Sequence, residues 1–242
     1  MVAGRGRLVA LDLAKTAALV CMAVYHFAYD LEMFGLVAPG TVLGGVWLPF
    51  SRAIAGSFLC LAGVSLWLAH GRGIRRGGVV RRFVIVGGAA AGITLVTFLA
   101  MPDRFIFFGI LHMMAFAGVA GLAFVMLPAW AVAGVALAVW GLPRVVFLPL
   151  FDTPLLQWVG LGTIWPRTVD YVPVFPWFGA VLAGIALARV LEAAGVWDRL
   201  RGVAFGRVAR ALAWPGRHSL AVYLIHQPVL IGAIWLWLRV TG

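Results

Sequence analysis

The sequence predicts an all-α, polytopic integral membrane protein: a bundle of about seven transmembrane helices with a cytoplasmic N-terminus. Of its 242 residues, 64% are hydrophobic and 11% are charged, against about 45–50% and 25% in an average soluble domain. The apolar residues form continuous runs of about 20 residues, the length with which a helix crosses a ~30 Å hydrocarbon core. The chain also holds 30 Gly and 11 Trp, and small residues and interfacial Trp are typical of helices in lipid.

The composition also excludes several classes of protein. A soluble globular enzyme, a disordered chain or a fibrous repeat does not carry this much apolar surface behind so few charges. The net charge of +11 would suggest a nucleic-acid partner in a soluble chain, but in a membrane protein it indicates basic cytoplasmic loops, so no nucleic acid is expected. Cys21 and Cys60 lie in apolar runs and make neither a disulfide framework nor a zinc site, so no metal is expected.

Seven apolar stretches are predicted to cross the membrane as helices. They are residues 9–31, 45–69, 82–100, 105–126, 128–148, 172–190 and 218–238. The first is interpreted as a retained span and not a signal peptide, because Asp12 and Lys15 interrupt it. Gly88 and Gly92 form a small-xxx-small pattern, which is typical of a helix packing face. We expect the whole chain, 1–242, to form a single domain.

The basic residues orient the bundle. With the N-terminus in the cytoplasm, 13 arginines lie inside and four outside, as the positive-inside rule requires. The inner set is Arg5, Arg7, Arg72, Arg75, Arg76, Arg81, Arg82, Arg189, Arg199, Arg201, Arg207, Arg210 and Arg217. The inner segment 191–216 predicts a helix lying on the membrane face, and the outer loop of about 149–171 is long enough to cap a site. We expect a multi-pass protein of the bacterial inner membrane, in contact with the lipid bilayer; homo-oligomerisation stays open.

Ionisable residues inside the first span are the leading functional candidates, because each costs several kcal/mol in lipid. Four of them fall within an arc of about 60° that runs along roughly 27 Å of helix, namely Asp12, Lys15, His26 and Asp30. This stripe must line a cavity or pair with other helices. Asp12 and Lys15 form an ion pair or hold substrate. His26 and Asp30 are neighbours at i, i+4, so the carboxylate either orients a catalytic imidazole or seals the helix end with it.

Two further polar residues lie in the second and fourth spans. His112 in the fourth is either a second base or a packed, hydrogen-bonded histidine. Arg52 in the second is positioned to neutralise Asp30 or Glu32, or to hold an anionic group. For both residues, spacing alone does not decide between the two roles.

The sixth and seventh spans add candidates at the outer side. Asp170, Tyr171 and Trp177 stand where the sixth helix begins, and two prolines in its first turns predict an irregular entry, which is tolerated where backbone faces protein or water. In the seventh span, His226 and Gln227 precede a proline. They either face a substrate or bond the backbone carbonyls that the proline frees.

Four blocks of the chain resemble a known family. They are Arg7 to Lys15 with Met22 to Leu31, Phe108 to His112, Asp170 to Trp177, and Gly216 to Pro228. In this order they resemble the heparan-α-glucosaminide N-acetyltransferase catalytic-domain family, which belongs with the broader transmembrane acyltransferases. The resemblance covers nearly the whole chain.

This resemblance implies an acetyltransferase that moves an acetyl group from cytosolic acetyl-CoA to a sugar amine or hydroxyl of an envelope glycan at the outer face. It implies that His26 acts as general base or nucleophile, with Asp30 orienting it and His112 assisting. Acetyl-CoA would be a donor substrate attracted by the basic loops, with no tightly bound cofactor. The candidate substrate-binding residues are Asp12, Lys15, Arg52, Asp170, Tyr171, Trp177, His226 and Gln227.

Two other functions stay open on the sequence. A transporter or flippase of a sugar or lipid-linked substrate would have the same polar cavity without chemistry, although no internal repeat supports it. A b-type haem carrier would use His26 and His112 as axial ligands.

Overall fold

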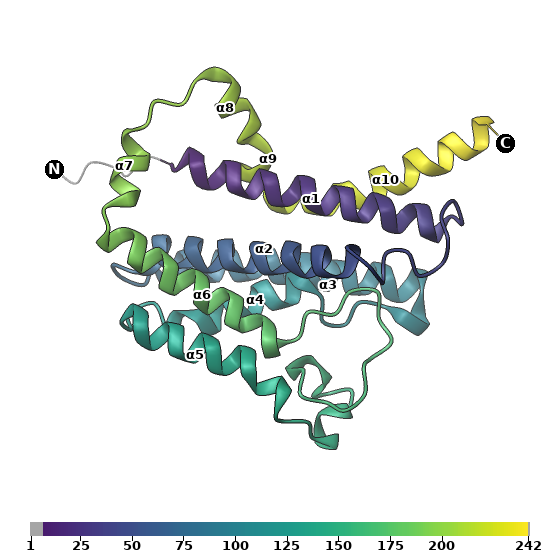
Figure 1. Ribbon diagram of the computed structural model, residues 1–242, viewed down its shortest axis with the longest axis horizontal. Helices are drawn as coiled ribbons and strands as arrows, with labels where there is room; N and C mark the ends of the chain where they lie inside the picture. The colour runs from purple at the N-terminus through teal and green to yellow at the C-terminus, as the bar shows by residue number, and fades with distance from the viewer. Residues whose placement is uncertain (1–6, 242) are drawn as a thin grey trace. The chain divides into compact units, whose positions relative to one another are not determined.

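The computed structural model describes residues 7–241, and these residues fold as helices joined by loops, so the predicted all-α class is confirmed (Figure 1). Five helices are long and apolar enough to cross a membrane, which makes the chain a multi-pass membrane protein. They are α1 (Val9–Met33), α2 (Trp47–His70), α3 (Arg76–Ala100), α6 (Val174–Ala193) and α10 (Ser219–Thr241).

Two of the seven predicted spans are shorter than expected. Helix α4 (Ile110–Ala120) continues for one 3-10 turn, Gly121–Ala123, and α5 (Ala129–Gly141) ends in another, Leu142–Arg144. At 1.5 Å per residue these helices reach only about 17–20 Å. The predicted span 105–126 began too early because Phe108 is extended backbone, bridged to Tyr171. The predicted span 128–148 ran too far because Pro143 lies in the closing 3-10 turn.

The inner segment differs most from its prediction. In place of one helix over 191–216, the chain forms α7 (Val196–Gly202), α8 (Arg207–Leu212) and α9 (Trp214–Arg217). Gly195 precedes α7 with a φ of +66° that other residues rarely adopt, and Gly206 precedes α8. Only Ala213 lies between α8 and α9. By contrast, the irregular entry into α6 is confirmed, because Phe175 lies outside the helical region with φ −98° and ψ 125°.

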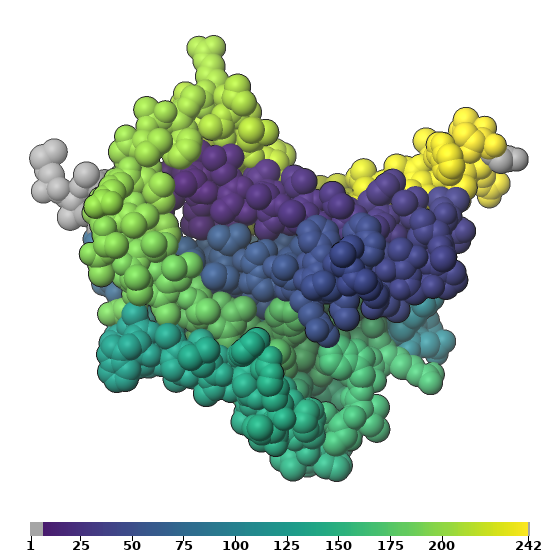
Figure 2. Space-filling model, in the orientation of Figure 1, coloured from purple at the N-terminus to yellow at the C-terminus, as the bar shows by residue number. Residues whose placement is uncertain are grey.

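Unit 1 comprises Met1–Phe58 and Gly195–Gly242, and its centre is the packing of α1 against α9 and α10. The buried side chains Leu19, Met22 and Ile234 lie in this unit. The opposite face of α1, with Val20 and Val24, is exposed, and in Figure 2 the purple surface of α1 is visible along the helix. Exposed apolar side chains on a long helix suit a face turned to lipid.

Unit 2, Leu59–Ala194, contains the second half of α2 and helices α3 to α6. Here α5 packs along α6, and α3 along α4. Two glycines bring α2 and α6 into backbone contact: a Cβ at Gly63 would overlap the Val181 carbonyl, and a Cβ at Gly184 would overlap the Cys60 carbonyl. Small residues allow helices this close approach in lipid.

The predicted packing face at Gly88 and Gly92 is wrong within the described chain. A Cβ added at either glycine would meet no atom within 4 Å. The close helix contact of unit 2 is made by Gly63 and Gly184 instead, one from each helix.

We expect Gly63→Ala or Gly184→Ala to destabilise the protein. The added methyl group meets a backbone carbonyl, which cannot rotate away, and overpacking of this kind costs about 1–3 kcal/mol or more. Thermal unfolding in detergent, followed by tryptophan fluorescence, should show a lower midpoint for both variants. Gly88→Ala is the matched control and should leave the midpoint unchanged or raise it. Equal midpoints for Gly63→Ala and Gly88→Ala would contradict the close-contact interpretation.

Candidate active site

The polar stripe of α1 is buried at both ends, as its cost in lipid requires. Asp12 is 3% exposed and Asp30 is 0% exposed. Asp12 pairs with Arg217 of α9 and Asp30 bonds Gln227 of α10, in both cases about 200 residues further along the chain. The stripe therefore pairs with other helices of unit 1.

At the N-terminal end of α1, Asp12 lies in a cluster of polar groups. Its carboxylate accepts a hydrogen bond from Arg7 Nε at 2.7 Å and forms an ion pair with Arg217 at 3.5 Å. Thr16 donates its hydroxyl to the Asp12 carbonyl at 3.1 Å and accepts the Gly216 amide at 2.9 Å. These contacts attach α9 to α1. The substrate role of Asp12, and its ion pair with the half-buried Lys15, stay predictions.

At the other end of α1, Asp30 bonds a different residue from the one expected. Gln227 Nε2 donates to Asp30 Oδ1 at 2.6 Å, joining α1 to α10. The expected hydrogen bond to His26 is not made, because neither His26 Nδ1 nor Asp30 Oδ2 has a partner among the described residues. The i, i+4 spacing correctly places the two residues one turn apart, but the carboxylate is turned to the neighbouring helix.

His26 and His226 form the centre of the candidate site. Their ring centroids are 4.9 Å apart with an interplanar angle of 65°. His226 Nδ1 lies 2.5 Å from the Tyr223 carbonyl, and a carbonyl can only accept, so Nδ1 carries the proton. In the neutral ring Nε2 then keeps a lone pair.

Four buried polar atoms of this cluster lack a hydrogen-bond partner among the described residues. They are His26 Nδ1, Asp30 Oδ2, His226 Nε2 and Gln227 Oε1. Buried polar groups are nearly always satisfied, so a set of four together indicates a place for a ligand, water or transferable proton. Among residues 7–241, no group of three or more His, Cys, Asp or Glu side chains is placed to hold a metal ion.

His112 lies in unit 2, and both of its ring nitrogens are engaged. The Thr94 hydroxyl donates to the Ile106 carbonyl at 2.7 Å, so at 3.0 Å it accepts from His112 Nε2–H. Nδ1 then accepts the Gly109 amide at 3.3 Å. The ring thus holds the start of α4. Its predicted role as a second base stays a prediction, and would require one of these bonds to break.

Asp170 also holds the start of α4. Its Oδ2 accepts the Ile110 amide at 3.0 Å, which satisfies one of the free N–H groups of a helix N-terminus. Gly109 is required beside it, because a Cβ there would overlap the same carboxylate. Burial raises the pKa of Asp170, and the Ile110 hydrogen bond partly opposes that rise.

Three candidate substrate-binding residues remain, namely Tyr171, Trp177 and Arg52. Tyr171 donates its hydroxyl to the Gln157 carbonyl at 2.5 Å, and burial raises its pKa to about 12. Trp177 is half-buried near the start of α6. Arg52 is exposed and makes no ion pair within residues 7–241. Glu32, one of its expected partners, instead accepts the amides of the loop at Gly40 and Val42.

The loop of about 149–171, predicted to lie at the outer side, is held by its own contacts. Asp152 accepts the amides of Thr163 at 2.6 Å and Ile164 at 3.0 Å. The Thr163 hydroxyl, followed by these amides, lowers the pKa of Asp152. Trp158 packs its ring on Phe108 and Phe116. The loop therefore covers α4, and its predicted function as the cap of a site stays a prediction.

The fold and the half-buried histidine pair define a multi-pass membrane protein with a polar centre in its first and last long helices. Residues 7–228 match the family described as heparan-alpha-glucosaminide N-acetyltransferase, catalytic. Because the match covers nearly all of the chain, the protein belongs to this family, and the resemblance found in the sequence is confirmed. The family is one of membrane acetyltransferases that use acetyl-CoA. Comparisons with curated proteins and with solved structures find no match.

We expect the Asp30–Gln227 pair to be coupled in stability. Gln227→Leu leaves a buried carboxyl without its donor, a change that costs about 1–3 kcal/mol. Replacing both residues by leucine removes the donor and the acceptor together, so the double variant should be less destabilised than the sum of the single variants. A double-mutant cycle of unfolding midpoints in detergent measures this difference. Simple additivity would show that the two side chains do not interact.

We also expect Asp170 to make stability depend on pH. Its raised pKa means that folding favours the protonated carboxyl. This contribution is complete below the ordinary carboxyl pKa of about 3.9 and is lost as the pH rises through the raised value. Asp170→Asn still accepts the Ile110 amide but cannot ionise. Its unfolding midpoint should therefore fall less than that of the unchanged protein as the pH rises from about 4.

The control for this pH series is Asp103→Asn, at an exposed carboxyl of the 3-10 turn Pro102–Arg104. It should keep the pH dependence of the unchanged protein. The assignment to Asp170 fails when Asp170→Asn and Asp103→Asn give parallel curves.

Proposed function

We propose that this protein transfers an acetyl group from cytosolic acetyl-CoA to the amine or hydroxyl of a sugar, in a cell-envelope glycan, at the outer face of the membrane. The observation that carries the proposal is the pair of imidazoles, His26 and His226, each of which has one buried nitrogen without a partner among the described residues. In a member of a membrane acetyltransferase family, an unpartnered imidazole nitrogen is the group that acetyl transfer needs.

The orientation proposed for the chain has the N-terminus in the cytoplasm of a bacterial cell. The chain crosses the membrane seven times, or five times if α4 and α5 enter only part of the bilayer. Because α4 and α5 are consecutive, both cases assign each arginine to the same side as the other case does. The short connection between them, 124–128, carries no charge. The 13 inner arginines thus favour this orientation in both cases. We treat 1–242 as one acyltransferase domain of the inner membrane.

In the direct form of the reaction, His26 acts as the general base. It accepts the proton of the sugar amine or hydroxyl while that nitrogen or oxygen attacks the thioester carbonyl. The carbon–sulfur bond breaks, CoA leaves as a thiolate, and the proton passes from the imidazole to that thiolate. General base catalysis of this kind contributes about 10²–10⁴-fold.

In the covalent form, the imidazole nitrogen itself attacks the thioester carbonyl. CoA leaves with a proton, and the acetyl group is carried as acetyl-imidazole until the sugar amine or hydroxyl takes it. Both forms need a ring nitrogen with a free lone pair. His26 Nδ1 is buried and without a partner, which supports His26 as the reacting residue.

The neighbours of His26 are given supporting roles. Asp30 acts through Gln227, because their hydrogen bond fixes α10 at the depth where His226 packs on His26. His226 accepts or returns a proton at Nε2, since its Nδ1 is fixed by Tyr223. His112 remains the second candidate base, behind His26, because its nitrogens are already engaged.

The donor and acceptor sides follow from charge. Acetyl-CoA carries phosphates, and the arginine-rich inner side attracts them. The acceptor is proposed to meet the residues at the outer side, with Asp170, Tyr171 and Trp177 as its candidate contacts. Asp12, Lys15 and Arg52 remain candidate substrate contacts as well.

The test is thioester cleavage by the purified full-length protein in detergent. With acetyl-CoA labelled in the acetyl group, free CoA and labelled glucosamine are measured with and without glucosamine. We expect His26→Ala and His226→Ala to lose about 10²-fold or more of the transfer rate. His218→Ala is the matched control: it also removes a histidine, but an exposed one between α9 and α10 that is bonded to the Trp214 carbonyl, and it should keep full activity.

Four outcomes of this assay are informative. Label on His26 with CoA released before glucosamine is added supports the covalent form, and release only with glucosamine supports direct transfer. Binding of acetyl-CoA without any release contradicts acetyl transfer to this acceptor. A folded His26→Ala protein with full activity shows that the reacting residue is wrongly assigned.

A further inference from the structure

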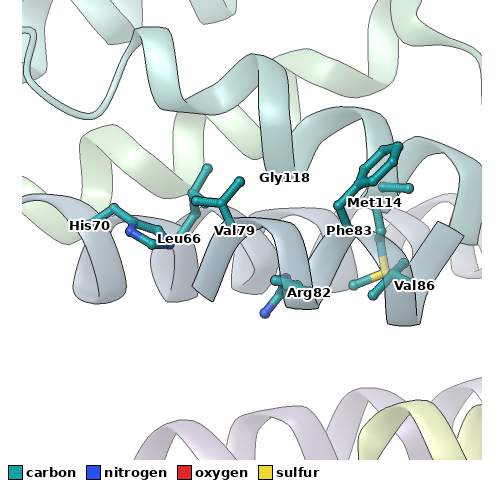
Figure 3. A pocket seen from close by; sticks show the side chains of 9 residues that line it. Leu66, His70, Val79, Arg82, Phe83, Val86, Met114 and Gly118 are labelled. Atoms are coloured by element: carbon teal, nitrogen blue, oxygen red, sulfur yellow. The ribbon is translucent and has the colours of Figure 1, made fainter. Parts of the chain in front are cut away.

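A cavity lies in unit 2 where α2 ends and α3 begins, and it is not part of the histidine site. It is open on one side, and together with that opening it spans about 260 Å³ of empty space between α2, α3 and α4 (Figure 3). Its lining is apolar apart from two residues, His70 and Arg82, and includes Val79, Phe83, Met114 and Gly118. A cavity with two cationic or donor groups and apolar walls suits a ligand that is anionic at one end and apolar at the other.

His70 gives this cavity a hydrogen-bond donor. The side chain is the last residue of α2 and is only 6% exposed. Its Nδ1 accepts the Arg75 amide at 3.3 Å, so in the neutral ring the proton lies on Nε2. No described residue accepts a hydrogen bond from this Nε2–H. A donor that lines an open pocket and has no protein acceptor is free to bond an acceptor atom of a ligand.

The start of α3 adds positive charge around His70. Arginines stand at 72, 75, 76, 81 and 82, and the first turn of α3 holds no acidic residue. Arg72 is paired with Glu192, and Arg75 donates to the Ala69 carbonyl at 3.2 Å. Within residues 7–241, Arg82 forms no ion pair with a carboxylate. The N-terminal amides of α3 contribute further partial positive charge.

The apolar part of the ligand follows from the exposed surface beside the cavity. Phe83 lines the cavity and is 48% exposed, and its helix neighbours Val80 and Val84 are 61% and 62% exposed. In a span, such side chains meet hydrocarbon. If a phosphate binds at Arg82, an apolar chain attached to it can therefore lie along α3, as the acyl chain of a lipid would.

We propose that this cavity binds the phosphate of an anionic phospholipid from the cytoplasmic leaflet. His70 Nε2 and the Arg82 guanidinium donate to the phosphate oxygens, and an acyl chain lies on Phe83, Val80 and Val84. Basic pockets between transmembrane helices on the cytoplasmic side commonly hold such head groups. The site is separate from the proposed acetyl-transfer chemistry and does not depend on it.

The experiment measures lipid binding to the purified full-length protein in detergent by native mass spectrometry and by the unfolding midpoint. We expect phosphatidylglycerol to bind and raise the midpoint, and phosphatidylcholine to do neither. Arg82→Gln should weaken phosphatidylglycerol binding about fivefold, the loss expected for one arginine at an anionic surface. His70→Phe, which removes the Nε2 donor, should weaken it as well.

Arg104→Gln is the matched control, because it removes an exposed arginine beyond the other end of α3. It should bind phosphatidylglycerol as the unchanged protein does. Equal binding of the two lipids, or no effect of Arg82→Gln in a protein whose lipid-free midpoint is unchanged, would overturn the proposal.

Free CoA and inorganic phosphate form the last arms of the experiment, because they carry the same phosphate chemistry without an acyl chain. Displacement of phosphatidylglycerol by CoA at equal concentration would assign the cavity to the donor substrate and overturn the lipid proposal. Displacement by neither supports it. These measurements need no turnover, so their failure leaves the acetyl-transfer assay unaffected.

Discussion

The hydrogen bond between Asp30 and Gln227 is the interaction on which the candidate active site depends. Asp30 is fully buried in an apolar bundle, and a carboxyl group there without a partner costs several kcal/mol. The bond therefore determines where along α1 the last long helix packs. Once Gln227 is fixed, the preceding residue, His226, lies against His26, one turn before Asp30. The imidazole pair is thus a consequence of satisfying one carboxyl group.

The same requirement explains the other polar groups of the chain and separates them from the site. Asp12 is neutralised by arginines, Asp170 accepts the first amide of α4, and both nitrogens of His112 are bonded. Each of these groups has a structural partner. The atoms at His26 and His226 have not, and a buried polar atom without a partner is tolerated where a function uses it. The presence or absence of an unpartnered nitrogen, and not the residue type, distinguishes His26 and His226 from His112.

The sequence predicts the long helices well, because continuous apolar runs of sufficient length have few other structures in lipid. It misplaces α4, since an apolar run does not show where the backbone becomes extended to pair with a distant segment. It also gives Asp30 the wrong partner: helical spacing finds neighbours within one helix, whereas Gln227 is 197 residues away. Likewise, Gly184 stands in a small-xxx-small pattern with Ala180 and Ala188, but Gly63 stands in none. Only the fold shows that each glycine abuts the other's helix.

The four blocks that carry the family resemblance contact one another in two pairs. The first and last blocks meet in unit 1: Gly216 abuts the Asp12 carbonyl, His226 packs on His26, and Gln227 bonds Asp30. The two middle blocks meet in unit 2, where Phe108 bridges to Tyr171 and Asp170 holds the helix that carries His112. Each block is therefore half of a helix contact. A substitution within one block acts on its partner block, so variants at the site are best interpreted in pairs.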